Sequence, residues 1–215
     1  MKIGVFDSGI GGLSVANAIK KAMPEHEIRF VNDSEHVPYG TKTKQELLNL
    51  SLPILTKMQA DGCQVIVIAC NTLTTTLISD LRASLSVPLV AIEPMVKPAA
   101  NMTKTGIIGV CATPATLASA RYAQLKSDYA KGVKVIEQDC SNWASLIEQN
   151  RIDRRQIKST VDSLIDGGAD VIVLGCTHYH WIEEDIRKWA DHKAEVIQPE
   201  EAIIRRLRQV LKQLA

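Results

Sequence analysis

The sequence predicts an α/β protein of two pseudo-symmetric lobes, each a mainly parallel sheet flanked by helices, with a candidate active site in the crevice between them. Short apolar stretches of strand length alternate with longer stretches of helical spacing along the whole chain, which is typical of parallel sheets. The stretch QVIVIACNT, which ends at Thr72, recurs as DVIVLGCTH, which ends at His178. A second stretch, IGVFDSGIGG from Ile3, recurs as IGVCATPATL from Ile108. Two repeated stretches in the same order indicate a duplicated lobe.

In the first half of the chain, short runs of apolar and β-branched residues predict four strands, bounded by turn-forming residues. These strands are Lys2–Phe6, Glu27–Val31, Gln64–Cys70 and Leu89–Ile92. Helical spacing predicts helices at Leu13–Ala22, Lys44–Asp61 and Thr75–Ser84. Pro53 is expected to bend or split the second helix, because proline removes a helical hydrogen bond.

The second half repeats this alternation after the prolines that follow Glu93 and Lys97. Strands are predicted at Gly106–Val110, Lys134–Ile136, Asp170–Cys176 and Glu195–Ile197. Helices are predicted from the turn at 112–116 through Leu125, at Asn142–Gln149, Arg154–Asp166 and Glu183–Ala190, and from Glu200 onward. We therefore expect residues 1–92 plus 196–215 to form the N-terminal lobe and residues 93–195 the C-terminal lobe.

Composition excludes several classes of protein. A hydrophobic content of 46% and a charged content of 23% are those of an ordinary globular protein. A net charge of +1 gives no reason to expect nucleic acid or an anionic membrane as a partner. No apolar run approaches the ~18 residues that span a bilayer. The five cysteines are an odd number without regular spacing, which indicates free thiols and a cytoplasmic location.

Cys70 and Cys176 end the two repeated strands, so they are expected at matching positions of the two lobes. Parallel sheets bind ligands beyond the carboxyl ends of their strands. Two thiols on opposite sides of one carbon can remove a proton from one face and return one to the other, which inverts a stereocentre. Asp7 near Cys70 and His178 near Cys176 can assist these proton transfers.

Two other interpretations of these residues remain open. The DSGIGG turn resembles a phosphate-binding loop, and Asp33 stands where a ribose-binding acid would follow such a loop. The same turn equally offers backbone N–H groups to a small carboxylate. Cys176, His178 and His180 are all of residue types that bind zinc, although no second pair of ligands lies nearby.

The motifs together resemble those of the glutamate racemases, which are cofactor-independent enzymes of the aspartate/glutamate racemase superfamily. The match runs along almost the whole chain. It comprises FDSGIGG at Phe6, PYGTK at Pro38, IACNT at Ile68, IEP at Ile92, ATPAT at Ala112, the Cys140–Glu148 spacing and GCTHY at Gly175. The resemblance implies an isomerase that interconverts L- and D-glutamate without pyridoxal phosphate, metal or nucleotide. It also implies a homodimer that supplies D-glutamate for peptidoglycan.

The resemblance further implies a role for each matching residue. Cys176 would deprotonate the L-amino acid and Cys70 the D-isomer, with Asp7 and His178 assisting and Glu148 orienting His178. The substrate-lining positions would be Asp7, Ser8, Tyr39, Gly40, Asn71, Thr72, Thr113, Thr116, Thr177 and His178.

The sequence also departs from the family pattern. His180 replaces a proline after GCTHY and can bring a new proton donor near Cys176, and Gln198 replaces an aspartate. The alternatives are therefore an aspartate racemase, a related two-cysteine isomerase of another small acid, and a non-catalytic protein that kept the ligand pocket.

Overall fold

The structure of the protein is a computed structural model that describes residues 1–214, and it consists of alternating strands and helices. The strands are β1 (Lys2–Asp7), β2 (Glu27–Asn32), β3 (Val65–Ile68), β4 (Leu89–Ala91), β5 (Ile107–Ala112), β6 (Lys134–Asp139), β7 (Val171–Gly175) and β8 (Glu195–Ile197). The helices are α1 (Gly12–Ala22), α2 (Lys44–Ala60), α3 (Asn71–Ser84), α4 (Val96–Met102), α5 (Pro114–Leu117), α6 (Ala120–Tyr129), α7 (Trp143–Glu148), α8 (Arg154–Asp166), α9 (Glu183–Ala190) and α10 (Glu200–Leu214), with short 3₁₀ segments η1 (Ser34–His36), η2 (Tyr39–Thr41) and η3 (Thr177–Ile182).

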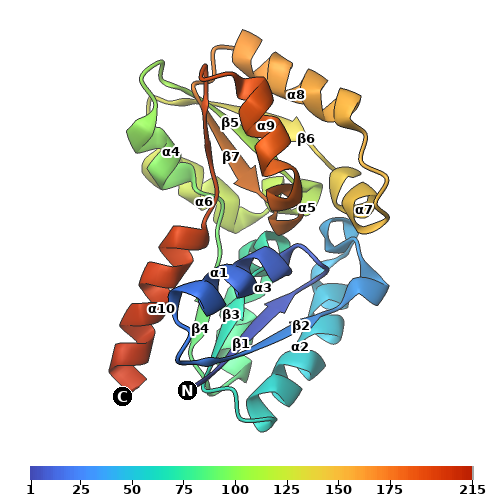
Figure 1. The fold of residues 1–215 in the computed structure, drawn as a ribbon, viewed down its shortest axis with the longest axis vertical. Helices are drawn as coiled ribbons and strands as arrows, with labels where there is room; N and C mark the ends of the chain where they lie inside the picture. Colours follow the sequence, from blue (N-terminus) through green and yellow to red (C-terminus); the bar gives the residue numbers. More distant parts are fainter. Residues whose placement is uncertain (215) are drawn as a thin grey trace.

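The strands form two parallel four-stranded sheets with the same topology, so the predicted fold class is confirmed. The first sheet has the order β2-β1-β3-β4 and the second the order β6-β5-β7-β8. Each strand of the first sheet therefore has a counterpart at the same place in the second. Figure 1 shows the two sheets as separate lobes, one above the other, with the long helix α10 lying beside the lower lobe.

Both faces of each sheet are covered by helices, which explains the continuous apolar runs of the central strands. All four residues of β3 and all five of β7 are buried. In the first sheet, Val65 and Val67 face α1 and α10, while Ile66 and Ile68 pack on the side of α2 and α3. The second sheet is sandwiched in the same way by α4 and α6 on one face and α7, α8 and α9 on the other.

The chain crosses between the lobes twice. It leaves the first sheet after β4 and returns after β8, and the returning α10 packs with α1 against the first sheet. We propose the division into lobes that the sequence predicts, with the second crossover placed after Ile197, because Ile197 still pairs with Val173 of β7.

Several elements differ from the sequence prediction. α4 was not predicted, and Pro98 is compatible with it because this proline lies in the first turn, where backbone N–H groups have no helical partner. α3 begins at Asn71 and not at Thr75, and α2 continues as one helix through Pro53. Among residues 1–214, no helix combines the length and apolar character that a membrane span requires.

Candidate active site

The carboxyl ends of the central strands of both sheets face one small cavity between the lobes. The cavity is lined by Ser8, Val37, Pro38, Tyr39, Gly40, Cys70, Asn71, Thr72, Thr113, Ala144, Cys176, Thr177 and His178. Both cysteines of the repeated strands thus face the same space, and each comes from a different lobe. The space open to the centre of a water molecule is only about 10 Å³, which is room for about one water molecule. The lobes are therefore in a closed arrangement.

Cys70 follows β3 and caps the N-terminus of α3. Its sulfur accepts the backbone N–H of Leu73 at 3.5 Å, and its thiol donates to Ser8 Oγ at 3.5 Å. Burial raises the pKa of the Cys70 thiol well above its ordinary value, and the nearby charge of Asp7 raises it further. The contacts with Ser8 and Leu73 offset only part of this effect. Cys70 is consequently a protonated thiol at neutral pH in this closed arrangement.

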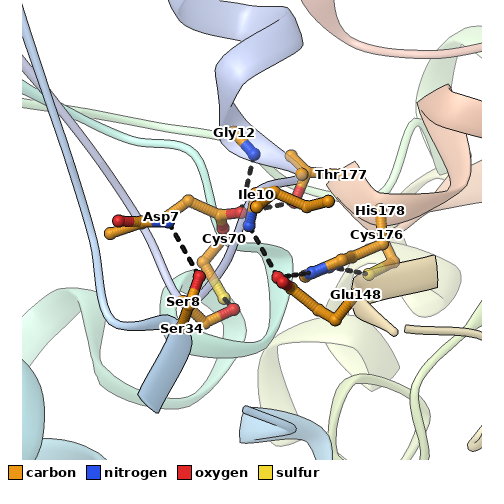
Figure 2. Close-up of polar contacts among 12 residues, drawn as sticks. Asp7, Ser8, Ile10, Gly12, Ser34, Cys70, Glu148, Cys176, Thr177 and His178 are labelled. Carbon is orange, nitrogen blue, oxygen red and sulfur yellow. Dashed lines mark hydrogen bonds and ion pairs between the residues drawn. The ribbon is translucent and has the colours of Figure 1, made fainter. Parts of the chain in front are cut away.

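Cys176 follows β7 at the equivalent place in the second lobe, but its surroundings are different. Its sulfur lies 3.6 Å from His178 Nδ1, and His178 Nε2 lies 2.8 Å from Glu148 Oε1 (Figure 2). Burial alone would lower the pKa of His178, but the hydrogen bonds to Cys176 and Glu148 outweigh it and raise the pKa to about 10. His178 is therefore an imidazolium at neutral pH, which can donate a hydrogen bond to a thiolate on Cys176.

Glu148, at the end of α7, is held by both lobes. Its Oε1 accepts the backbone N–H of Ile10 at 2.6 Å in addition to its contact with His178. Burial works against the ionised form of Glu148, but these two hydrogen bonds prevail and lower its pKa. The carboxylate can therefore orient the ring of His178 and stabilise its charge.

Asp7 lies at the end of β1, beneath the cavity, and does not line it. Its Oδ2 accepts the backbone N–H of Gly12 at 2.7 Å and the hydroxyl of Thr177 at 3.2 Å (Figure 2). Its Oδ1 is buried without a partner in the described part of the chain. Burial raises the pKa of Asp7, and the charge of His178 and the backbone hydrogen bonds counteract this only in part. The contact with Thr177 joins the two lobes directly.

The glycines of the DSGIGG turn allow the second lobe to approach closely. A Cβ atom on Gly9 would lie 1.9 Å from Glu148 Oε1 and 2.7 Å from His178 Nε2, and one on Gly11 would lie 2.5 Å from the backbone nitrogen of His178. The N–H of Gly12 is already bonded to Asp7. These contacts explain the glycines without a bound phosphate and disfavour the nucleotide interpretation.

Asp33 makes contacts that differ from the ribose-binding role considered for it in the sequence analysis. It is buried, and its Oδ2 accepts the hydroxyl of Tyr39 at 2.7 Å while its Oδ1 lies 2.7 Å from His36 Nδ1. Asp33 therefore holds Tyr39 against the cavity. The residues between it and Tyr39 contribute Val37 and Pro38 to the cavity wall.

A group of hydroxyl side chains joins the lobes on the side of Cys70. Thr72 Oγ1 lies 2.9 Å from Thr113 Oγ1 and 3.4 Å from Thr116 Oγ1. Thr116 is buried behind Thr113 and does not line the cavity itself. Next to them, both polar atoms of the Asn71 side chain are buried without partners in residues 1–214. Buried polar groups are normally paired, so Asn71 is free to bind polar atoms of a ligand.

The three residues of the zinc interpretation do not converge on one point. His178 uses one ring nitrogen toward Cys176 and the other toward Glu148, and His180 contacts Ser14 and Glu200. Residues 1–214 contain no group of three His, Cys, Asp or Glu side chains suited to a metal ion.

Some cavity residues could not be found from sequence. Ala144 and Val37 are apolar residues in the wall of the cavity, and no chemical feature distinguishes them from core residues. Pro38 directly precedes Tyr39, which was predicted to line the site, so this neighbouring position could have indicated Pro38 as a cavity residue.

Comparison with known proteins gives a consistent result. A family model described as Asp/Glu/Hydantoin racemase matches residues 13–207. Glutamate racemase from Ectopseudomonas mendocina is 37% identical over an alignment that covers 98% of this chain and 82% of that protein. Glutamate racemase from Roseiflexus sp. is 36% identical, with coverage of 98% and 79%.

Solved structures show the same similarity. Escherichia coli glutamate racemase in complex with L-glutamate and the activator UDP-MurNAc-Ala has a TM-score of 0.91 at 28% identity, with 98% of this chain and 82% of that chain covered. Glutamate racemase from Francisella tularensis in complex with D-glutamate has a TM-score of 0.81 at 27% identity, with coverage of 99% and 81%. An aspartate racemase homologue from Pyrococcus horikoshii has a TM-score of 0.56 at 17% identity, with coverage of 97% and 98%, and shares the fold alone.

Proposed function

The chain belongs to the Asp/Glu/hydantoin racemase family, and on that premise we propose that it is a glutamate racemase that interconverts L- and D-glutamate without a cofactor. One observation carries the proposal more than any other. Cys70 and Cys176 stand at equivalent positions of two duplicated lobes and line the same cavity. Proton transfer at a stereocentre needs an acid and a base on opposite faces of one carbon.

The surroundings of the two thiols suit one direction of this reaction. In the L-to-D direction, Cys176, paired with the imidazolium of His178, acts as a thiolate and removes the α-proton. Cys70, kept protonated by burial and by Asp7, donates its proton to the other face of the carbanion. The reverse direction exchanges the two roles. Each step moves one proton, and the pair of sulfurs ends with the charge exchanged between them.

The other cavity residues are proposed to bind the substrate. Asn71 has unpaired amide atoms for a carboxylate or ammonium group, and Thr72, Thr113 and Thr177 line the same cavity. Thr116 lies behind them and acts through its contacts with the Thr72 and Thr113 hydroxyls. Ser8, Tyr39 and Gly40 complete the wall next to Cys70. Glu148 acts through His178. Such fixed dipoles in a site without bulk water stabilise the developing carbanion.

Substrate entry requires the lobes to separate. The closed cavity holds about one water molecule, whereas glutamate has ten heavy atoms. Opening at the two crossovers would admit the substrate, and closing would exclude water during proton transfer.

Three broader properties rest on the family resemblance. We propose that the protein acts in the cytoplasm, that its D-glutamate supplies peptidoglycan, and that it forms a homodimer. Light scattering on the purified protein measures the last property, and a monomer at micromolar concentration would contradict it.

Chiral analysis of candidate acids incubated with the purified protein tests the proposed function. Glutamate of either configuration is expected to become an equal mixture of both isomers, while aspartate is not. Conversion of aspartate and not glutamate would support the sister activity. Binding of glutamate without conversion at any pH would support a non-catalytic protein. The double variant Cys70→Ser/Cys176→Ser is the control for contaminating racemases.

A further inference from the structure

His180 occupies a buried position between the lobes, although it follows the cavity residues by only two positions. Its side chain is 2% exposed. Its Nδ1 lies 3.0 Å from Ser14 Oγ in α1 and 3.5 Å from Glu200 Oε1 at the start of α10. Both partners belong to helices that pack on the first sheet, whereas η3 follows the second. The expectation that His180 brings a proton donor to Cys176 is therefore not supported by its contacts.

The geometry of η3 explains why His180 faces the first lobe. In a 3₁₀ segment, residues three apart lie on the same face. Thr177 and His180 are such a pair, and both contact the first lobe, Thr177 through Asp7 and His180 through Ser14. His178 lies on a different face and contacts Cys176 and Glu148. One face of η3 is thus fixed to the first lobe while another serves the cavity.

The partners of His180 are themselves fixed at the two places that determine how the lobes meet. Ser14 Oγ donates to the carbonyl of Gly11, in the turn that packs directly on His178. Glu200 is the first residue of α10, and its N–H is bonded to Gln198 at the second crossover. A hydrogen bond from His180 therefore connects the crossover, the glycine turn and η3.

We propose that His180 is a positioning residue that holds η3 against the first lobe and thereby keeps Thr177 and His178 in place when the lobes close. The proposal rests on the proposed function, because its kinetic consequence is on the racemisation of glutamate. The Glu200 carboxylate beside Nδ1 can only accept a hydrogen bond, and the Ser14 hydroxyl already contacts the Gly11 carbonyl, so we assign a hydrogen to His180 Nδ1. His180 Nε2 is buried and has no partner within residues 1–214, so Nδ1 alone makes the polar contacts of the His180 ring with the first lobe.

Two substitutions of His180 distinguish a positioning role from proton transfer by this residue. In His180→Asn, the side-chain amide takes the place of Nδ1, so near wild-type kinetics are expected. In His180→Leu, the hydrogen bond is lost and the closed arrangement is less populated. Loss of one hydrogen bond of ordinary strength changes such an equilibrium about fivefold, so KM for both isomers is expected to rise about fivefold with a smaller change in kcat. Adding Ser14→Ala to His180→Leu is expected to cost little more, because both remove the same contact.

The matched control is Ser84→Ala. The Ser84 hydroxyl contacts only the Asp80 carbonyl of its own helix and is exposed. Its removal is expected to leave both kcat and KM unchanged. The shape of the pH profile is expected to be the same in wild type and His180→Leu, since His180 transfers no proton.

Hydrogen exchange of the η3 amides, measured without substrate, tests the proposal independently of activity. Faster exchange across residues 177–182 in His180→Leu, and wild-type exchange in His180→Asn, are expected even if the protein racemises a different acid or none. Unchanged exchange in His180→Leu would overturn the positioning role. So would an Asn variant as impaired as the Leu variant with a shifted pH profile, which would make His180 a proton donor.

Discussion

Glu148 Oε1, in the second lobe, lies 2.6 Å from the backbone nitrogen of Ile10, in the glycine turn of the first lobe. The same oxygen lies 2.8 Å from His178 Nε2. The partner that maintains the charge of His178 is therefore oriented by the opposite lobe. This arrangement is complete only when the lobes are closed, so in the proposed reaction the closed state would both exclude water and hold His178 beside Cys176.

The two cysteines are expected to be equally indispensable. Cys70→Ser and Cys176→Ser are each predicted to lower kcat at least about 1000-fold, because a hydroxyl is a much weaker acid and base than a thiol. Circular dichroism and thermal unfolding should stay near wild type, since the change is small. Cys63→Ser is the control, because Cys63 packs against Gly4 away from the cavity and should retain activity. Substantial turnover by either site variant would refute a two-base reaction.

Glu148→Gln is expected to lower the pKa of His178, because it removes a carboxylate that helps to raise this pKa to about 10. Above its pKa, the charged fraction of His178 falls about tenfold per pH unit. The alkaline limb of the kcat profile should therefore move to lower pH. Initial rates between pH 7 and 10 measure this shift, and an unshifted alkaline limb would remove the assigned role.

The same variant should not make kcat/KM differ between the two directions. L- and D-glutamate have equal free energies in water, so kcat/KM must be the same from either side in every variant. A specific effect on Cys176 can appear only in the separate values of kcat and KM for the two isomers.

Gly9→Ala is expected to abolish most activity, because the added Cβ would lie 1.9 Å from Glu148 Oε1. Either the lobes close incompletely or Glu148 leaves His178, and a loss of about 100-fold is expected from misplacement of a catalytic group. Gly132→Ala is the comparison, since a Cβ there meets no atom within 4 Å and only the left-handed backbone is strained. Gly132→Ala should lose about 1 kcal/mol of stability and little activity. Normal turnover by Gly9→Ala would show that this close packing is unnecessary.

Asp7 and His178 make stability depend on pH in the same direction. Both have raised pKa values in the folded protein. A group whose pKa is higher in the folded than in the unfolded protein stabilises the fold at pH values below its unfolded pKa. This stabilisation is lost as the pH rises through the folded pKa. For His178 the loss occurs between pH 6.5 and about 10. Urea unfolding should therefore show lower stability at pH 9 than at pH 6.

Asp7→Asn removes one part of this dependence. As the pH is raised from 3.8, the ordinary pKa of this carboxyl group, the stability of Asp7→Asn should fall less than that of the wild type. Its kcat should fall because Cys70 and Thr177 lose the neighbouring carboxyl group. An identical pH dependence of stability in the two proteins would contradict the raised pKa of Asp7.

Sequence patterns predicted the sheets and the two cysteine positions because they depend on local signals. The runs before Cys70 and Cys176 are buried on both faces, and burial of this kind leaves an uninterrupted apolar stretch. The start of α3 was misplaced because Asn71, Thr72 and Thr74 have low helix propensity, yet all three are buried in that helix. Tertiary packing overrode propensity at that point.

Local sequence patterns could not predict the contacts between the lobes. Ser14 and Glu200 are at opposite ends of the chain, and nothing in either stretch indicates that His180 lies between them. Within the first lobe, the bond from Tyr39 to Asp33 was also not predicted, because the sequence offered a ribose-binding role for Asp33.

Racemisation of L-glutamate in D₂O, followed by NMR and chiral separation during the first turnovers, tests the central claim most directly. With two opposed thiols, the new D-glutamate should carry deuterium at Cα from the start, while the remaining L-glutamate keeps its proton. Deuterium appearing equally early in both isomers would indicate a single base that serves both faces. Absence of Cα exchange altogether would contradict the proposed proton transfer.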